Sequence, residues 1–453
     1  MQKESRLQSF LNDPARALWS MALPIIAGMM VQTLFNVVDI MFIGWLGADE
    51  VTAVAFVSPL FFIIIGLTVG LGAGVTASIA QYIGKKDKRN ADNCAEHAIL
   101  LGIAITVLLT VLGVYFGKDL LILLGAYDHI LDTAHSYLKI LTFGIGGVVF
   151  SLFFRAILAG EGETTIPMII GLVGTIANVI LDPIFIFLLE YGVDGAAIAT
   201  VLSQAIMLVM YFTVIFVMKK TFISFNFRHF RYTPNILNVI FKVGIPSSLS
   251  MLIISFGQAV LNKILINYSS ESVAAYQIVS RIDMLLFMPC LGIAIALTTI
   301  VGMFFGAKEF SKLVWIVKYG ISRAFMITLV NVAILFLSAK IILPIFTSNQ
   351  EVLSIGITYL KIIVLVYPAV AVSVICARIC QAFGQGMPLL VVTTIRVLVI
   401  TAPLSLYFYQ TGKPVVWVWY SQVLAILIAT VISFLFLQYY LKKFHIVGDA
   451  SNS

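Results

Sequence analysis

Polar side chains that could bind a cation lie at helical spacing inside apolar stretches of this 453-residue chain. Asn178 and Asp182 are four residues apart in the run TIANVILDPIF, and Pro183 follows them directly. Carboxylate and amide oxygens are ligands for hard cations such as Na⁺, and a carboxyl group can instead hold a proton. The run therefore predicts a cation or proton site on an element that Pro183 can loosen, because proline removes a backbone donor.

A second polar stripe precedes it in the chain. Gln32, Asn36 and Asp39 are separated by four and then three residues, which places them on one face of a helix. Thr175 extends the first stripe by three residues toward the N-terminus, on the face of Asn178. Two stripes of this kind can supply the oxygen ligands of one shared site if the helices that carry them meet.

The elements that carry these stripes are predicted to be transmembrane helices. Hydrophobic residues make up 61% of the chain and charged residues 11%, with a mean hydropathy of +1.06, whereas soluble proteins carry about 25% charged residues. Apolar stretches of about twenty residues recur from end to end, each long enough to cross a bilayer. The composition predicts an all-α polytopic membrane protein. The polar first sixteen residues lack the pattern of a cleavable signal peptide.

Polar breaks divide the chain into twelve predicted transmembrane helices, an even number that places both termini on one side. Fifteen Lys and Arg residues lie in the segments on the side of the termini, and three (Lys118, Lys340 and Lys413) lie on the other. Because cytoplasmic loops carry the excess of Lys and Arg, both termini are predicted to be cytoplasmic. The net charge of +7 is then a topology signal, and nucleic-acid binding is not expected.

The longest internal break divides the spans into two sets of six, and the second half matches the first at a constant shift of 222 residues. The matched pairs include Pro24 with Pro246, Gly70 with Gly292, and Lys86 with Lys308. The expected organisation is a cytoplasmic N-terminal segment (1–16), an N-terminal lobe (17–218), a cytoplasmic linker (219–238), a C-terminal lobe (239–441) and a cytoplasmic tail (442–453). Transporters built from repeats bind substrate between them and expose it to the two sides in turn.

Three polar residues of the N-terminal lobe lie at matched depth. Counted from the nearest span ends, Asp39, Asp182 and Thr200 are roughly 9–12 Å below the outer surface at 1.5 Å per residue. A charge at bilayer depth costs roughly 2.5–3.5 kcal/mol, so each carboxyl group needs a partner, a proton or an aqueous cavity. We interpret Asp39, Asn178, Asp182 and Thr200 as a site for H⁺ or Na⁺. The alternative is that these residues only join helices, at about 0.6 kcal/mol per hydrogen bond.

The order of these features resembles the multidrug and toxic compound extrusion (MATE) family of cation-coupled exporters. The resemblance rests on the first span, LPIIAGMMVQTLFNVVDIMFIGWLG, the turn AGEGETTIPM and the segment ANVILDP, and it extends from about residue 14 to 440. It implies that an Asp in the first span and an Asn–Asp pair in the fifth bind the coupling cation. Asp39, Asn178 and Asp182 match those positions, and Thr200 matches a further ligand in the sixth span.

Two acids that characterise the NorM-like branch, a Glu in span 7 and an Asp in span 10, have no counterpart in this chain. The DinF-like branch fits better. The resemblance also implies that Pro24 bends the first span during transport, although a static kink is an equal alternative. Pro24, Gln32, Asn36 and Thr175 are therefore candidates for gating or for lining the substrate cavity.

One acidic residue lies well inside the spans of the second half. Asp283 is two residues from Arg281, a spacing at which side chains on a helix do not face each other. Arg396 lies at similar depth and is the expected ion-pair partner of Asp283. A structural ion pair is favoured over a contact with substrate.

Three classes of function remain for such a chain. The favoured one is an antiporter that exports amphiphilic, often cationic drug-like molecules in exchange for H⁺ or Na⁺. The alternative is a flippase for lipid-linked oligosaccharides or lipids, which should line its cavity with Arg and Lys. An enzyme is not expected, because the five histidines lie in breaks or tails and no nucleophile, metal or Walker motif occurs. We expect no cofactor beyond the coupling ion, and a monomer in the inner cell membrane.

Overall fold

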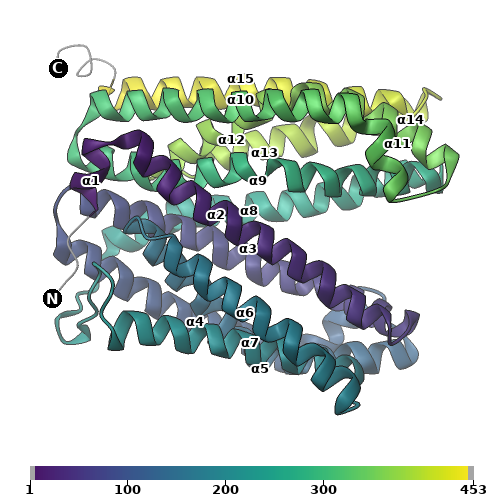
Figure 1. Ribbon diagram of the computed structural model, residues 1–453, viewed down its shortest axis with the longest axis horizontal. Coiled ribbons are helices and arrows are strands. Elements are labelled where there is room, and N and C mark those ends of the chain that lie inside the picture. The colour runs from purple at the N-terminus through teal and green to yellow at the C-terminus, as the bar shows by residue number, and fades with distance from the viewer. Residues whose placement is uncertain (1–5, 447–453) are drawn as a thin grey trace. The chain divides into compact units, whose positions relative to one another are not determined.

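The computed structural model describes residues 6–446, and within them the side chains of 34–37 and 229 are left out of the description. The described residues are almost entirely helical, without strands, and twelve helices or helix groups are long and apolar enough to cross a membrane. Figure 1 shows these helices as long rods. The predicted fold class and number of spans are confirmed.

The chain divides into two compact units. Lobe 1 contains the described residues up to Leu7 together with Ala27–Gly244, and lobe 2 contains Gln8–Ile26 and the residues from Ile245 onward. Two transmembrane helices therefore belong to both lobes. Helix α2 (Pro14–Gly44) changes lobe after Ile26, and α8 (Pro234–Ile266) changes lobe after Gly244. Each change lies two residues from a proline, Pro24 in α2 and Pro246 in α8, and these prolines are a repeat pair.

Lobe 1 is a bundle in which α5 packs against α3, α4 and α7, and α6 packs against α7 (Figure 1). Its core contains Ile43, Val57, Leu121, Tyr137 and Ile186, each almost completely buried. The helices that lie wholly in this lobe are α3 (Ala48–Gly84), α4 (Lys88–Leu123), α5 (Asp128–Gly160), α6 (Thr165–Pro183), η1 (Ile184–Leu188), α7 (Gly192–Phe212), η2 (Thr213–Val217) and η3 (Phe227–His229).

Lobe 2 is a second bundle, in which α12 packs against α9, α10 and α15. Its core is rich in aromatic residues, among them Tyr276, Tyr359, Tyr367 and Trp419. Its helices are α1 (Leu7–Asn12), of which all but Leu7 lies in this lobe, α9 (Ser270–Ala307), α10 (Phe310–Ile342), η4 (Leu343–Ile345), α11 (Gln350–Ile363), η5 (Val364–Val366), α12 (Tyr367–Ala382), α13 (Met387–Thr394), η6 (Ile395–Thr401), α14 (Ala402–Gln410) and α15 (Val416–Lys443).

Several spans are interrupted by a change of helix type. In the fifth span, α6 ends at Pro183 and continues as the π-helix η1. In the tenth span, α11 gives way to the 3-10 turn η5, and α12 begins at Tyr367 with Pro368 next to it. Proline removes one backbone donor, and interruptions of this kind often mark functional positions or hinges. Each of these two interruptions lies close to an intramembrane carboxyl group.

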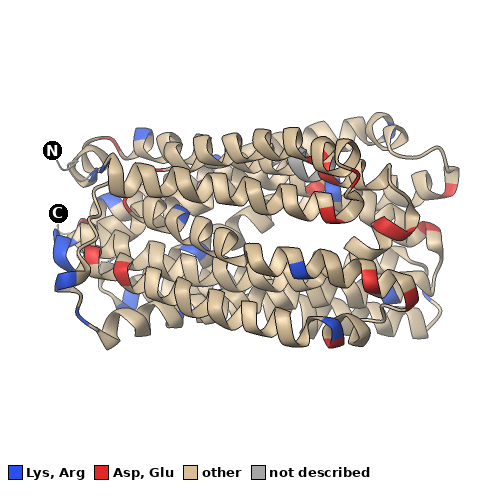
Figure 2. Ribbon diagram, turned by 90° about the horizontal axis from the view of Figure 1, so that it is seen from below, with Lys and Arg blue, Asp and Glu red and all other residues tan. Residues whose placement is uncertain are grey.

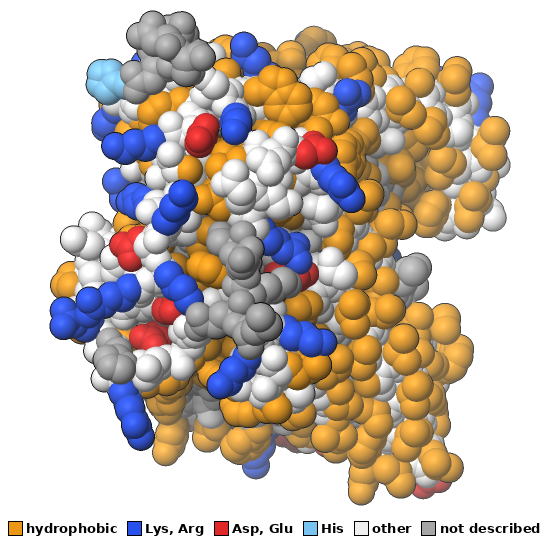
Figure 3. Space-filling view, turned by 60° about the vertical axis from the view of Figure 1, so that its left-hand side comes forward, with side chains coloured by type: hydrophobic (Ala, Val, Ile, Leu, Met, Phe, Trp, Pro, Cys, Tyr) orange, Lys and Arg blue, Asp and Glu red, His pale blue; other side chains and the backbone are white. Residues whose placement is uncertain are grey.

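Charged residues are sparse along the helices and gather toward the helix ends, as Figure 2 shows. The face in Figure 3 carries many Lys and Arg side chains, and the flank beside it is mostly hydrophobic. This distribution suits helices whose middle segments lie in hydrocarbon, because a charge there is costly. Charged residues that do lie in the middle of a span therefore require a specific explanation.

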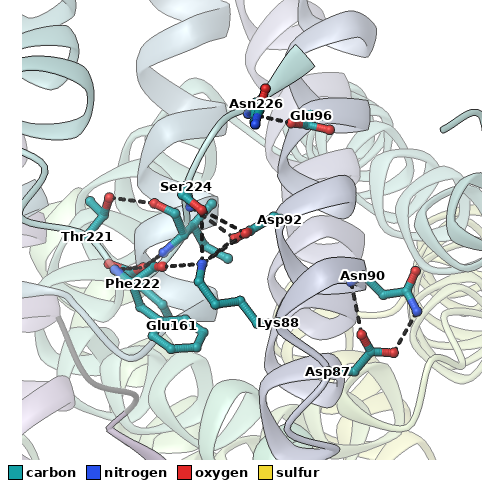
Figure 4. Close-up of polar contacts among 11 residues, drawn as sticks. Asp87, Lys88, Asn90, Asp92, Glu96, Glu161, Thr221, Phe222, Ser224 and Asn226 are labelled. Carbon is teal, nitrogen blue, oxygen red and sulfur yellow. Dashed lines mark hydrogen bonds and ion pairs between the residues drawn. The ribbon is translucent and has the colours of Figure 1, made fainter. Parts of the chain in front are cut away.

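The segment that follows the sixth span is held to lobe 1 by carboxylates that accept backbone hydrogen bonds. We call residues 219–233 the linker segment. Glu161, at the end of α5, accepts from the backbone nitrogens of Phe222 at 2.8 Å and Ile223 at 3.0 Å through one oxygen (Figure 4). A carboxylate that accepts two backbone donors is a strong attachment point.

Helix α4 supplies two more attachment points for the linker segment. Asp92 accepts from the Ser224 backbone nitrogen at 2.9 Å and from the Lys88 ammonium at 2.9 Å, and Glu96 accepts from the Asn226 backbone nitrogen at 2.7 Å (Figure 4). The Lys88 ammonium also donates to the Phe222 carbonyl at 2.8 Å. The linker segment is therefore an ordered part of lobe 1.

Candidate functional site

The Asn–Asp pair of the fifth span lies in the interior of lobe 1, on the last turns of α6. Asn178 is 1% exposed and Asp182 is completely buried. The spacing of four residues places the two side chains on one face, and the Asn178 amide nitrogen donates to Asp182 Oδ1 at 3.0 Å. Pro183 follows, and the helix continues in π form. The pair is thus fixed beside an irregular stretch of backbone, as its sequence suggested.

Asp39 comes from the part of α2 that belongs to lobe 1, and its side chain is partly buried. Its carboxyl group lies against the carboxyl group of Asp182. Two acidic side chains in contact inside an apolar bundle cannot both remain charged without a compensating cation. The structure thus brings together the two carboxyl groups that the sequence placed at one depth.

Three oxygens at this position lack a partner. Asp39 Oδ1, Asn178 Oδ1 and Asp182 Oδ2 are buried and accept no hydrogen bond from the part of the chain that the structure describes. Such groups are rare, and each calls for a ligand or an unseen donor. Oxygens from two carboxylates and one amide suit Na⁺, and a proton shared by the carboxyl groups would satisfy two of them. The described residues contain no cluster of three His, Cys, Asp or Glu side chains suited to a transition metal.

Tyr137 belongs to this site, although the sequence analysis did not select it. It lies on α5, is 7% exposed and interacts electrostatically with both Asp39 and Asp182. Its phenol, a hydrogen-bond donor and acceptor, therefore lies within electrostatic range of the carboxyl pair. A signal was present in the repeat, because Tyr137 and Tyr359 are 222 residues apart.

Thr200 is partly buried on α7, the helix that packs against α6. Its carbonyl accepts from the Ser203 hydroxyl at 2.8 Å, but its own hydroxyl makes no hydrogen bond to Asp39, Asn178 or Asp182 within the described residues. Its role as a fourth ligand stays a prediction. To fill this role, the Thr200 hydroxyl would have to reach the other three residues by a rotation of the side chain or contact them through a bound ion.

The candidates for gating or cavity lining are spread over two helices. Thr175 is partly buried on α6, one turn before Asn178, and Gln32 is exposed on α2. Asn36 is on α2, but its side chain lies outside the described residues. Pro24 is inside α2, in the portion that belongs to lobe 2, two residues before the change of lobe. A bend at Pro24 would therefore act where the helix passes from one lobe to the other.

The expected ion pair between Asp283 and Arg396 does not form. The Asp283 carboxylate instead accepts a hydrogen bond from the Tyr367 hydroxyl, and no cationic side chain among the described residues lies within ion-pair distance of it. Tyr276 interacts electrostatically with both Arg396 and Asp283. Similar depth did not imply contact, because depth says nothing about the direction in which each helix presents its side chain.

Two lobes of transmembrane helices related by a repeat, with a buried carboxyl pair beside a broken span, define a secondary-transporter architecture. The MatE family model matches residues 24–184 and again residues 246–407. The two matches begin 222 residues apart (246 − 24), which is the shift of the internal repeat. The chain belongs to the MATE family of multidrug and toxic compound extrusion transporters.

Curated relatives match along most of their length. A probable multidrug resistance protein, YoeA, of Bacillus subtilis is 24% identical over 94% of this chain and 94% of its own. A probable multidrug resistance protein, NorM, of Thermotoga maritima is 26% identical over 89% of this chain and 88% of its own. The multidrug export protein MepA of Staphylococcus aureus is 25% identical over 85% of each chain.

Solved structures agree with the fold. A MOP-superfamily transporter from Pyrococcus furiosus, described as having a binding pocket of reversed polarity that suggests a different function, is 31% identical with a TM-score of 0.92, over 98% of this chain and 99% of that one. A MATE transporter in a bent conformation is 30% identical with a TM-score of 0.93 over both full chains. The protein is thus a multi-pass membrane transporter of small molecules, not an enzyme.

Proposed function

We propose that the protein exports amphiphilic, often cationic drug-like molecules in exchange for H⁺ or Na⁺. The observation that carries the proposal is the contact between Asp39 and Asp182, together with the three buried oxygens that have no partner among the described residues. An ion bound there removes an electrostatic cost that the empty site carries. Its binding therefore favours one arrangement of α2 and α6, and its release favours another.

The proposed substrate class rests on the names of the relatives and on the negative charge of the site. The curated relatives are named for multidrug resistance or multidrug export, and the intramembrane acids of lobe 1 suit positively charged molecules. A flippase for lipid-linked oligosaccharides is less favoured, because phosphate groups call for Arg and Lys at this position. We further propose a monomer in the cell membrane, since one chain contains both lobes, with its termini in the cytoplasm.

The test uses proteoliposomes with an H⁺ gradient and a Na⁺ gradient imposed separately. Export of a cationic dye should be driven by at least one gradient in the wild type and should be lost in Asp39→Asn and Asp182→Asn. Asp194→Asn is the matched control. Asp194 is also a carboxyl residue of lobe 1, but it accepts from the Ser136 hydroxyl at 2.6 Å and makes no hydrogen bond to Asp39, Asn178 or Asp182 within the described residues. This control should retain export.

Two results would contradict the proposal. Gradient-driven export by both Asp39→Asn and Asp182→Asn would show that the carboxyl pair has no part in coupling. Dye movement that depends on ATP, or that depends on neither gradient in the wild type, would rule out the antiport mechanism itself. Measuring the two gradients separately also identifies the coupling ion.

A further inference from the structure

Asp283 is an intramembrane carboxyl group that the mechanism above does not use. It lies on α9, 13 residues from the start of that helix at Ser270 (283 − 270), or about 20 Å along the axis. Its partner is the hydroxyl of Tyr367. A charged carboxylate at this depth needs more than one neutral donor, unless it binds a cation or a proton.

Tyr367 occupies a special place in the tenth span. It is the first residue of α12, directly after the 3-10 turn η5 that ends α11, and Pro368 follows it. Tyr367 is 5% exposed. Its hydrogen bond to Asp283 therefore connects α9 to the position at which the tenth span changes helix type. Mid-helix 3-10 stretches often mark hinges.

Besides Tyr367, two tyrosines interact electrostatically with Asp283, and none of the described cations forms an ion pair with it. Tyr276 on α9 itself and Tyr359 on α11 interact electrostatically with the carboxyl group. Arg396 of η6 acts on Tyr276. On the next turn of α9, the neutral amide of Asn331 from α10 donates to the Leu286 carbonyl at 2.8 Å.

Helix α15 closes the cluster with an aromatic ring and an amide. The rings of Tyr359 and Trp419 have centroids 4.2 Å apart, and the Tyr359 hydroxyl donates to the Gln422 amide oxygen at 3.2 Å. Trp419 Nε1 and Gln422 Nε2 are buried and have no acceptor in the described chain. Since buried polar groups are normally satisfied, this cluster has two hydrogen-bond donors to spare for another arrangement of its side chains.

The two lobes offer a parallel. In lobe 1, Asp182 lies beside the break between α6 and η1, and Tyr137 interacts with it electrostatically. In lobe 2, Asp283 contacts the break between α11 and α12, and Tyr359, the repeat partner of Tyr137, interacts with it electrostatically. Asp283 itself corresponds to Phe61 in the repeat (283 − 222). The acid of lobe 2 therefore arises from a different helix and is no copy of Asp39.

We propose that Asp283 is a second proton-binding group, located in lobe 2, and that its hydrogen bond to Tyr367 links the proton to the break between α11 and α12. A proton suits the site better than Na⁺, because the Tyr367 hydroxyl is the one hydrogen-bond partner of the carboxylate within the described residues, and Na⁺ requires several oxygen ligands. The charged carboxylate holds Tyr367 in place. Protonation neutralises the acceptor and weakens that bond, which frees the break to move.

Two readouts in purified full-length protein separate the two parts of the proposal. The first is infrared difference spectroscopy between high and low pH, in which a protonated carboxyl group gives a C=O stretching band. The second is the fluorescence of Trp419, in a variant whose other four tryptophans are replaced by Phe. Trp419 is completely buried and packs in one core cluster with Tyr359 and Tyr367.

In the wild type we expect one carboxyl band assignable to Asp283 and, in the single-tryptophan variant, a fluorescence step over the same pH range. Asp283→Asn should lose both, whereas Asp39→Asn should keep both. Tyr367→Phe should keep the band, because the acid remains, but lose the step, because the link to the break is removed. This pattern stands whether or not the lobe 1 site drives transport.

Each other outcome is decisive against a part of the proposal. If Asp283→Asn leaves the carboxyl bands of the infrared difference spectrum unchanged, Asp283 does not take up a proton. The same follows if the wild type shows no carboxyl band. A fluorescence step that survives in Tyr367→Phe shows that the proton does not act through this hydroxyl. Thr328→Val, which removes a hydroxyl of lobe 2 bonded only within its own helix α10, controls for general loosening and should change neither readout.

Discussion

Tyr137 of lobe 1 and Tyr359 of lobe 2 are equivalent positions of the 222-residue repeat, and each interacts electrostatically with intramembrane carboxyl groups of its own lobe. The tyrosines are retained, but the acids around them are not. Asp39 is replaced by Leu261 at the equivalent position, and lobe 2 presents Asp283 from another helix. The two lobes therefore share a framework and differ in the ion chemistry that it carries.

The difference between the lobes predicts unequal effects on transport. Asp283→Asn should reduce uphill export less than Asp39→Asn at matched expression, because only Asp39 belongs to a carboxyl pair with unsatisfied oxygens. Drug accumulation in cells that express each variant measures the difference. If Asp283→Asn reduces export more than Asp39→Asn does, the assignment of the coupling site to lobe 1 is wrong.

The linker segment provides a test of topology. Phe227 is 49% exposed, and the four native cysteines are all buried. A Phe227→Cys variant should react with an impermeant thiol reagent only after cells are opened, if the excess of Lys and Arg marks the cytoplasmic side. Thr221 would be a poor choice, because it is buried and donates to the Ile223 carbonyl. Reaction in intact cells would reverse the assigned orientation.

The attachment of the linker segment predicts resistance to proteolysis. Glu161→Ala removes the acceptor of two backbone hydrogen bonds and should lower the stability of this attachment by about 1–3 kcal/mol. Trypsin should then cleave faster at Lys219, Lys220, Arg228 or Arg231. Glu309→Ala, which removes a half-exposed acid that lies 3.9 Å from the Lys312 ammonium, is the matched control. Equal cleavage rates for both variants would show that the contacts of Glu161 do not hold the segment.

The close packing of α3 against α8 predicts that a methyl group added at one glycine lowers the stability of the protein. A Cβ at Gly74 would lie 2.4 Å from the Ile240 carbonyl oxygen, so α3 and the start of α8 would have to separate. Gly74→Ala should destabilise the protein by about 1–3 kcal/mol. Gly171→Ala is the control, because a Cβ there meets nothing within 4 Å. Thermal unfolding in detergent compares them, and equal melting temperatures would contradict the close approach.

Much of the fold could be predicted because transmembrane helices can be recognised in a sequence from their length and hydropathy. Length and hydropathy identified all twelve spans, and the matched prolines and glycines identified the repeat that the family model confirms. Helical spacing also placed Asn178 and Asp182 on one face, where a hydrogen bond now joins them. These features depend on local periodicity, which a single sequence contains.

Contacts between helices were harder to predict. Periodicity defines the faces of each helix but not which faces meet, so Tyr137 was missed and Asp283 was assigned to Arg396 instead of Tyr367. The attachment of the linker segment was missed because its donors are backbone nitrogens, which every residue except proline has. The division of α2 and α8 between lobes was invisible as well, since both helices are continuous in hydropathy.

The most direct test of the central claim is drug affinity in detergent, measured against Na⁺ concentration and against pH for wild type, Asp39→Asn and Asp182→Asn. Coupling between two ligands is reciprocal, so an ion that drives export must weaken drug binding, and removing its site must remove that effect. We predict that wild-type affinity depends on at least one of the two ions and that both variants lose this dependence while remaining folded. If both variants keep the wild-type dependence, Asp39 and Asp182 only join helices, and the proposed coupling site is wrong.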